Sequence, residues 1–178
     1  PVLHIEPLRY PESTRSLLEP MADVDYLEVD NKAELINLIR QKPYEVLFVR
    51  LGLAIDEEVI EAANQLRFIV TPTTGLNHID LDSAKAQNIE VISLKGETEF
   101  LATIQSTSEH TWGILLSLIR KIGKANDSVR EGNWVREPFL GMELQGKTLG
   151  ILGYGRLGRI VAGYGRAFGM RVLVNDTD

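Results

Sequence analysis

Short apolar runs alternate with longer amphipathic stretches over the first hundred residues, and this rhythm constrains the fold more than any other feature. The apolar runs predict strands at Val2–Ile5, Tyr26–Val29, Val46–Val49, Phe68–Thr71 and Val91–Leu94. The stretches between them predict helices at Glu12–Glu19, Lys32–Arg40, Glu57–Gln65 and Leu81–Gln87. Three of these helices follow a residue suited to cap them: Asn31, Asp56 and Asp80. Because strands that alternate with helices pair in parallel and are covered on both faces, we expect a doubly wound α/β sheet.

The strand pattern then disappears, and a second α/β unit is expected to begin near residue 99. The apolar spacing from about Thr98 to Lys124 predicts one long helix, with a shorter polar helix over Ala125–Arg130. After a connector, the pattern predicts a strand, a helix and a strand, at Lys147–Leu152, Arg156–Phe168 and Arg171–Asn175. We therefore expect two domains, 1–98 and 99–178. The second is expected to be incomplete at its C-terminal end, because a dinucleotide-binding sheet of this type has about six strands.

One glycine motif in the second unit has the wrong surroundings for its usual role. Gly141–Thr148 satisfies the phosphate-loop pattern G-x-x-x-x-G-K-[ST], which requires a strand before it and a helix after it. Here an irregular segment precedes the motif and strand-like residues follow it. The prediction is that Gly146 makes a turn and that Lys147 opens a strand.

A second glycine motif does have the required surroundings. Gly153, Gly155 and Gly158 form G-x-G-x-x-G between an expected strand and an expected helix, as in dinucleotide-binding folds. The three glycines permit a tight turn, a close approach of the backbone to a pyrophosphate, and close packing of helix on strand. The amides of Arg156 and Leu157 would lie at the helix N-terminus, where the dipole favours an anion. A glycine-rich turn that binds nothing is the alternative interpretation.

An acidic residue near the end of the sequence bears on the choice of cofactor. Asp176 directly follows the last expected strand, where its carboxylate would accept hydrogen bonds from the adenosine ribose hydroxyls. The 2′-phosphate of NADP would meet like charge there, and Thr177 and Asp178 supply no cation. The sequence therefore predicts NAD as the cofactor.

Composition argues against several other classes of function. The absence of cysteine excludes disulfides, thiolate metal sites and cysteine nucleophiles, and we expect no metal site. A net charge of −6 offers no attraction to nucleic acid or to an anionic membrane. The longest apolar stretch, Ile114–Ile119, is too short to span a bilayer, and the N-terminus lacks the pattern of a signal peptide. We expect a cytoplasmic protein without nucleic-acid or membrane partners.

The motifs also carry a specific resemblance. Glu143–Gly158 and Ala167–Met170 resemble the D-isomer-specific 2-hydroxyacid dehydrogenases, a family that includes phosphoglycerate dehydrogenase and hydroxypyruvate reductase. Thr74–Leu81, Ser108–Thr111 and Val129–Trp134 also resemble family segments, whereas residues 1–45 agree only in their α/β rhythm. The resemblance implies a flavodoxin-like substrate domain that faces a Rossmann NAD-binding domain across a cleft. It also implies a homodimer formed through the helix that begins near residue 99.

The resemblance assigns substrate-binding roles to four residues. Arg50 occupies the position of an arginine near the substrate carboxylate, and the loop Thr73, Thr74 and Gly75 would offer backbone amides to that carboxylate. Thr74 would also lie near the nicotinamide. Such an anion clamp would hold a 2-hydroxy or 2-oxo acid in line for hydride transfer. The alternatives are that Arg50 is a surface charge at a strand end and that the threonines only form a turn.

The catalytic arginine, glutamate and histidine of the family are expected beyond residue 178, so we expect the chain to Asp178 to be inactive by itself. Its own histidines, His4, His78 and His110, are expected to be structural. The implied activity is the NAD-dependent interconversion of a small D-2-hydroxy acid and its 2-oxo acid. The alternative is a non-catalytic NAD-sensing or corepressor-type protein on the same scaffold, and a purely structural role is a third interpretation.

Overall fold

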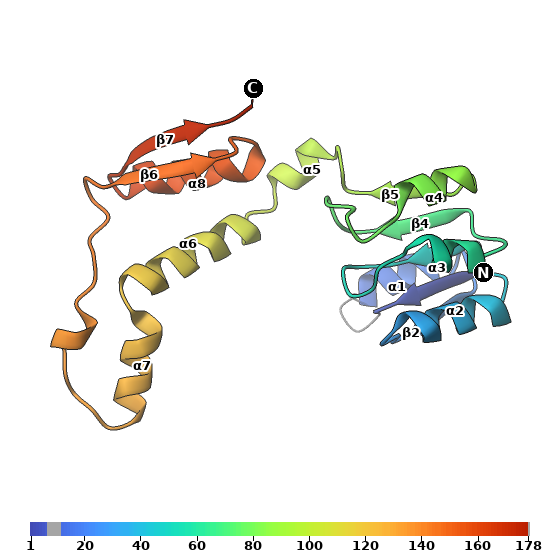
Figure 1. The fold of residues 1–178 in the computed structure, drawn as a ribbon, viewed down its shortest axis with the longest axis horizontal. Coiled ribbons are helices and arrows are strands. Elements are labelled where there is room, and N and C mark those ends of the chain that lie inside the picture. Colours follow the sequence, from blue (N-terminus) through green and yellow to red (C-terminus); the bar gives the residue numbers. More distant parts are fainter. Residues whose placement is uncertain (7–11, 178) are drawn as a thin grey trace. The chain divides into compact units, whose positions relative to one another are not determined.

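The computed structural model describes residues 1–6 and 12–177, and it divides into two compact units, Pro1–Thr98 and Glu99–Asp178 (Figure 1). The elements of the first unit are β1 (Val2–Ile5), α1 (Glu12–Leu18), β2 (Val24–Leu27), α2 (Lys32–Gln41), β3 (Val46–Phe48), α3 (Glu57–Ala62), β4 (Phe68–Thr71), α4 (Leu81–Ala86) and β5 (Glu90–Ser93). The strands form a parallel sheet in the order β2-β1-β3-β4-β5. The predicted doubly wound α/β fold is confirmed, with the strand order of flavodoxin-like folds.

The core of the first unit lies between the central strands and the helices. Strand β1 is buried along its whole length, and the largest fully buried side chains include Leu3, Leu47 and Ile69 from neighbouring strands. Leu35 of α2 and Ile60 of α3 are also fully buried. Burying each such side chain contributes about 1.5–3 kcal/mol relative to leaving it exposed. This packing fixes the positions of the loops that follow the strands.

The predicted helix caps are confirmed. Asn31 Oδ1 accepts a hydrogen bond from the amide of Glu34. Asp56 and Asp80 cap α3 and α4 in the same way. The predicted strand at Tyr26–Val29 is displaced, because the register with β1 pairs Val2 with Val24 and so draws β2 toward the N-terminus.

The second unit contains α5 (Thr98–Ala102), α6 (Ser106–Ile119), α7 (Ile122–Arg130), the 3-10 turn η2 (Glu137–Phe139), β6 (Thr148–Leu152), α8 (Arg156–Ala167) and β7 (Arg171–Asn175). Strands β6 and β7 pair in parallel. Helix α6 packs on α8 through Trp112, whose ring lies 5.9 Å from that of Tyr164 and 5.0 Å from that of Phe168. Gly146 has a left-handed φ of 74° and lies in the predicted turn, and β6 begins at Thr148, one residue after the predicted start at Lys147.

The prediction of one long helix from Thr98 to Lys124 is wrong, because the segment is broken twice. At the first break the hydroxyl of Thr103 donates to the carbonyl oxygen of Phe100. The side-chain amide of Gln105 donates to the carbonyl oxygen of Ala102. These side chains compete with helix continuation for the last carbonyls of α5. At the second break Lys121 adopts a left-handed φ of 53°, which ends α6.

Candidate functional site

The second unit carries the predicted glycine-rich turn between β6 and α8. Gly153 has a left-handed φ of 93°. A Cβ at Gly158 would lie 2.1 Å from the carbonyl oxygen of Gly153, so only glycine lets the helix start this close to the strand. A Cβ at Gly155 would meet nothing within 4 Å, so the space before the turn is open. The turn therefore has the tight bend and the open approach that a pyrophosphate requires.

The first turn of α8 can donate to an anion. Its N-cap residue is Gly155, which has no side chain to satisfy the first amides. The guanidinium of Arg156 points elsewhere, because its Nη1 donates to the carbonyl oxygens of Leu101 and Ile104 at 2.9 and 3.0 Å. The proposed phosphate contact is therefore assigned to the backbone amides of Arg156 and Leu157, to which the N-cap residue offers no side-chain hydrogen bond.

Asp176 lies beside this turn. Its carboxylate accepts hydrogen bonds from the amides of Tyr154 and Thr177. The structure thus joins the two predicted parts of the cofactor site, because Tyr154 belongs to the glycine-rich turn and Asp176 follows β7. A tight turn, an open approach, an uncapped helix and a nearby carboxylate together fit a dinucleotide.

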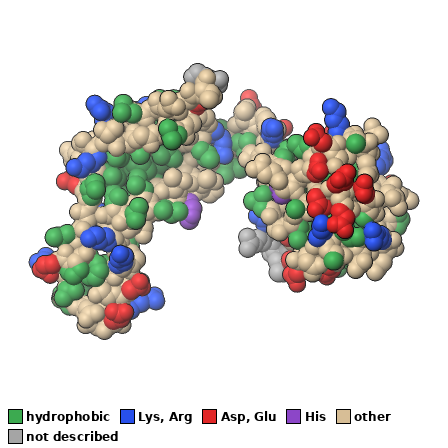
Figure 2. All heavy atoms as spheres, viewed as in Figure 1, with side chains coloured by type: hydrophobic (Ala, Val, Ile, Leu, Met, Phe, Trp, Pro, Cys, Tyr) green, Lys and Arg blue, Asp and Glu red, His purple; other side chains and the backbone are tan. Residues whose placement is uncertain are grey.

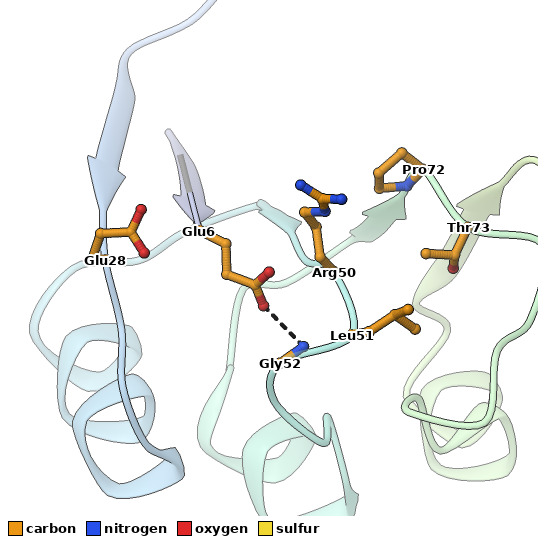
Figure 3. A pocket seen from close by; sticks show the side chains of 7 residues that line it. All are labelled: Glu6, Glu28, Arg50, Leu51, Gly52, Pro72 and Thr73. Atoms are coloured by element: carbon orange, nitrogen blue, oxygen red, sulfur yellow. Dashed lines mark hydrogen bonds between the residues drawn. The ribbon is translucent and has the colours of Figure 1, made fainter. Parts of the chain in front are cut away.

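The first unit has a cavity of about 550 Å³ at the carboxyl edge of its sheet (Figure 3). It is lined by Glu6, Glu28, Arg50, Leu51, Gly52, Pro72 and Thr73. Of the residues predicted to bind substrate, Arg50 and Thr73 are in this lining, after β3 and β4 respectively. Thr74 and Gly75 follow Thr73 in the same loop but are not in the lining. The topology thus brings Arg50 and the loop to neighbouring strand ends.

A chain of side chains supports this loop. His78 Nε2 lies 3.4 Å from Thr71 Oγ1, which lies 3.0 Å from Thr73 Oγ1. The Thr73 hydroxyl donates to the carbonyl oxygen of Gly75 at 2.9 Å. Burial lowers the pKa of His78, so its imidazole is mostly neutral at pH 7. Sequence reasoning missed the contribution of Thr71 and His78 to this loop. The available signal was the spacing of Thr71 and Thr73, two positions apart at the end of a predicted strand.

Sequence reasoning also missed an acidic residue in the cavity. Glu6 directly follows β1, and its Oε1 accepts a hydrogen bond from the amide of Gly52 at 3.0 Å. A Cβ at Gly52 would lie 2.5 Å from that oxygen, so the carboxylate fits there only because residue 52 is glycine. No motif pointed to Glu6, since its partner is 46 residues away in the sequence.

Two further properties concern the described part of the chain. Within residues 1–6 and 12–177, no helix has both the length and the apolarity needed to cross a bilayer. The same residues hold no group of three or more His, Asp or Glu side chains arranged to bind a metal ion.

Comparison with known proteins agrees with this geometry. Residues 112–178 match the family model of the D-isomer specific 2-hydroxyacid dehydrogenase, NAD binding domain. The D-3-phosphoglycerate dehydrogenase of Archaeoglobus fulgidus is 39% identical over 168 residues, which are 89% of this chain and 31% of that protein. The hydroxypyruvate reductase of Thermotoga maritima is 36% identical over 152 residues, or 85% of this chain and 46% of that protein.

Solved structures share the fold. The D-lactate dehydrogenase of Aquifex aeolicus, complexed with NAD and lactic acid, matches with a TM-score of 0.82 and 28% identity, over 100% of this chain and 52% of that one. An acyclic imino acid reductase in complex with NADPH and D-Arg matches with a TM-score of 0.80 and 27% identity, over 98% and 55%. The chain thus spans about half the length of these structures, and 31% of the Archaeoglobus relative. The matched domain identifies NAD as its cofactor, as predicted from the sequence. The chain is thus similar to the D-isomer-specific 2-hydroxyacid dehydrogenases, and residues 112–178 match the NAD binding domain of that family.

Proposed function

We propose that the protein containing this chain interconverts a small D-2-hydroxy acid and its 2-oxo acid, using NAD. The observation that carries the proposal is the glycine-rich turn in its strand–helix setting, with the carboxylate of Asp176 hydrogen-bonded to the turn amide of Tyr154. The matched NAD-binding domain and the family relatives support it.

The second unit is proposed to hold the dinucleotide. When bound, NAD supplies the acceptor or donor of the hydride. The amides of Arg156 and Leu157 would donate to the pyrophosphate, and Gly153, Gly155 and Gly158 would let the backbone approach it. Asp176 would accept hydrogen bonds from the ribose hydroxyls and repel a 2′-phosphate, which favours NAD over NADP.

The first unit is proposed to hold the substrate. Arg50 and the amides of the loop Thr73, Thr74 and Gly75 would bind the substrate carboxylate, and Thr74 would also contribute to binding the nicotinamide. Arg50 and Thr73 line one cavity, which supports this division of roles. Fixing the carboxylate orients the reacting carbon, and such positioning accounts for much of the rate enhancement in reactions of this kind.

Assays of the complete protein test this proposal. Its NADH oxidation is measured with glyoxylate, hydroxypyruvate, pyruvate and 3-phosphohydroxypyruvate. We expect turnover with at least one of them, and a loss of kcat/KM of about tenfold or more in Arg50→Gln. Arg40→Gln, at an exposed position near the end of α2, is the matched control and should leave kcat/KM unchanged. NAD binding by the folded protein without turnover of any 2-oxo acid contradicts the proposal and favours an NAD-sensing role.

A homodimer is the proposed assembly, formed through α6 and α7. Both helices expose apolar side chains, with Leu118, Ile122 and Val129 each more than half exposed. Figure 2 shows hydrophobic side chains gathered over this part of the second unit. Exposed apolar side chains gathered in one region are typical of a protein interface. Sedimentation of the complete protein should give a dimer, and Leu118→Asp should shift it toward monomer.

A further inference from the structure

The carboxyl edge of the first sheet carries its charges in an order that the strand order imposes. Glu28 and Glu6 directly follow β2 and β1. Arg50 and Thr73 lie two residues after the ends of β3 and β4. Since the sheet order is β2-β1-β3-β4, the edge presents two carboxylates, then a guanidinium, then the threonine loop. All four residues line the same cavity (Figure 3). Among the described residues that line the cavity, Arg50 is the one cation, and it lies between the carboxylates and the loop.

The Glu6 carboxylate is held in place. The backbone of Glu6 has a left-handed φ of 61°, which turns the chain at the end of β1. The amide of Gly52 donates to Oε1, and the missing Cβ of Gly52 leaves room for that oxygen. Figure 3 shows the side chain directed at Gly52, in the loop that also carries Arg50. The negative charge thus belongs to the wall of the cavity.

The charge of Glu6 also acts on His78, which lies in the loop between β4 and α4. It acts to raise the pKa of His78, against the larger lowering caused by burial. His78 contacts Thr71, which contacts Thr73 of the proposed substrate loop.

We propose that this cavity selects 2-oxo acids whose distal end is an uncharged or cationic hydrogen-bond donor, and that Glu6 disfavours a phosphorylated distal end. The inference rests on the proposed function, because it takes the substrate carboxylate to be held by Arg50 and the loop. With Arg50 so engaged, a second anionic group directed toward Glu6 meets like charge, whereas a hydroxyl or ammonium group donates a hydrogen bond to the Glu6 carboxylate. The inference gives this chain a preferred substrate different from that of the Archaeoglobus relative, a D-3-phosphoglycerate dehydrogenase.

Substrate competition in the complete protein tests this. The values of kcat/KM for hydroxypyruvate and 3-phosphohydroxypyruvate are measured in the wild type, in Glu6→Gln and in Glu90→Gln. We expect the wild type to favour hydroxypyruvate, and Glu6→Gln to shift the ratio toward the phosphorylated substrate by about tenfold. Gln retains an acceptor for the Gly52 amide, so the substitution removes charge while keeping the contact. Glu90 begins β5 at the opposite edge of the sheet, so Glu90→Gln should leave the ratio unchanged.

Salt provides a second measurement that needs no variant. Because added salt screens charges that solvent reaches, the preference of the wild type for hydroxypyruvate should shrink as ionic strength rises. Equal or better use of 3-phosphohydroxypyruvate by the wild type overturns the inference and leaves the proposed function standing. A ratio that neither salt nor a folded Glu6→Gln variant changes also overturns it. The absence of turnover with every 2-oxo acid instead overturns the proposed function, and this inference with it.

Discussion

At the scale of single residues, Asp176 carries the proposed choice of cofactor. Asp176→Ala should weaken NADH binding about tenfold or more, since a hydrogen bond to a charged group contributes about 1.5–3 kcal/mol. It should also narrow or reverse the preference against NADPH, because the repulsion of the 2′-phosphate is removed. Titration of both cofactors by fluorescence measures the two effects. Unchanged affinities for both cofactors would show that Asp176 is not part of the site. Asp127→Ala, on α7, is the control and should leave both affinities unchanged.

A second residue-scale prediction concerns acid stability. Asp25 accepts hydrogen bonds from Lys42 Nζ and the Tyr44 hydroxyl, and these bonds lower the pKa of its carboxyl. A carboxyl whose pKa is lower in the folded state stabilises the fold above its unfolded pKa, about 3.9, and this stabilisation is lost as the pH falls. Asp25→Asn should therefore flatten the fall of Tm between about pH 5 and pH 3. Asp30→Asn, at an exposed position, should keep the wild-type slope, and an equal flattening there would contradict the account.

Whether the role of a single residue can be predicted depends on how far away in the sequence its partners lie. The residues of the glycine-rich turn and Asp176 could be found because their partners lie within one strand–helix–strand segment. Glu6 could not, because its contact with Gly52 exists only once β1 and β3 are neighbours. The contacts of Thr71 and His78 likewise depend on how the loop after β4 folds back.

At the scale of elements, two of the glycines in α8, Gly163 and Gly165, have different surroundings. A Cβ at Gly165 would lie 2.8 Å from a methyl carbon of Leu149 and 3.2 Å from one of Val172, so α8 packs directly on the sheet there. A Cβ at Gly163 would meet nothing within 4 Å, and nothing in the structure explains a glycine at that position. Gly163→Ala should raise stability by about 0.5–1 kcal/mol, because alanine favours the helix. Gly165→Ala should lower it, because the helix must move away from the strands.

Urea unfolding of the two variants measures this pair directly. Since both substitutions change helix propensity equally, their difference reports the packing of α8 on β6 and β7. Equal stabilisation by both would show that α8 does not approach the sheet as described.

Elements were predicted well where local signals determine them and poorly where distant contacts do. The caps at Asn31, Asp56 and Asp80 and the sheet of the first unit follow from local pattern. The breaks that divide α5, α6 and α7 do not follow from local pattern. At the first of them Arg156, more than 50 residues away, donates to the carbonyl oxygens of Leu101 and Ile104.

At the scale of the whole molecule, the central claim is that the two units serve one reaction. The second unit carries the turn that fits NAD, and the first carries the cavity with Arg50 and Thr73. The sequence predicted this division because the alternating pattern stops near residue 98 and begins again near residue 147. The substrate could not be predicted, because selection depends on side chains such as Glu6 that only the folded sheet edge assembles.

The transfer of isotope from cofactor to product tests that claim most directly. The complete protein is incubated with hydroxypyruvate and NADH deuterated at the transferable position of the nicotinamide, and the product is analysed by mass spectrometry and chiral chromatography. The account predicts D-glycerate with one deuterium at the carbon that bears the new hydroxyl. An unlabelled product or the L-isomer, formed by a folded protein that binds NADH, would contradict it.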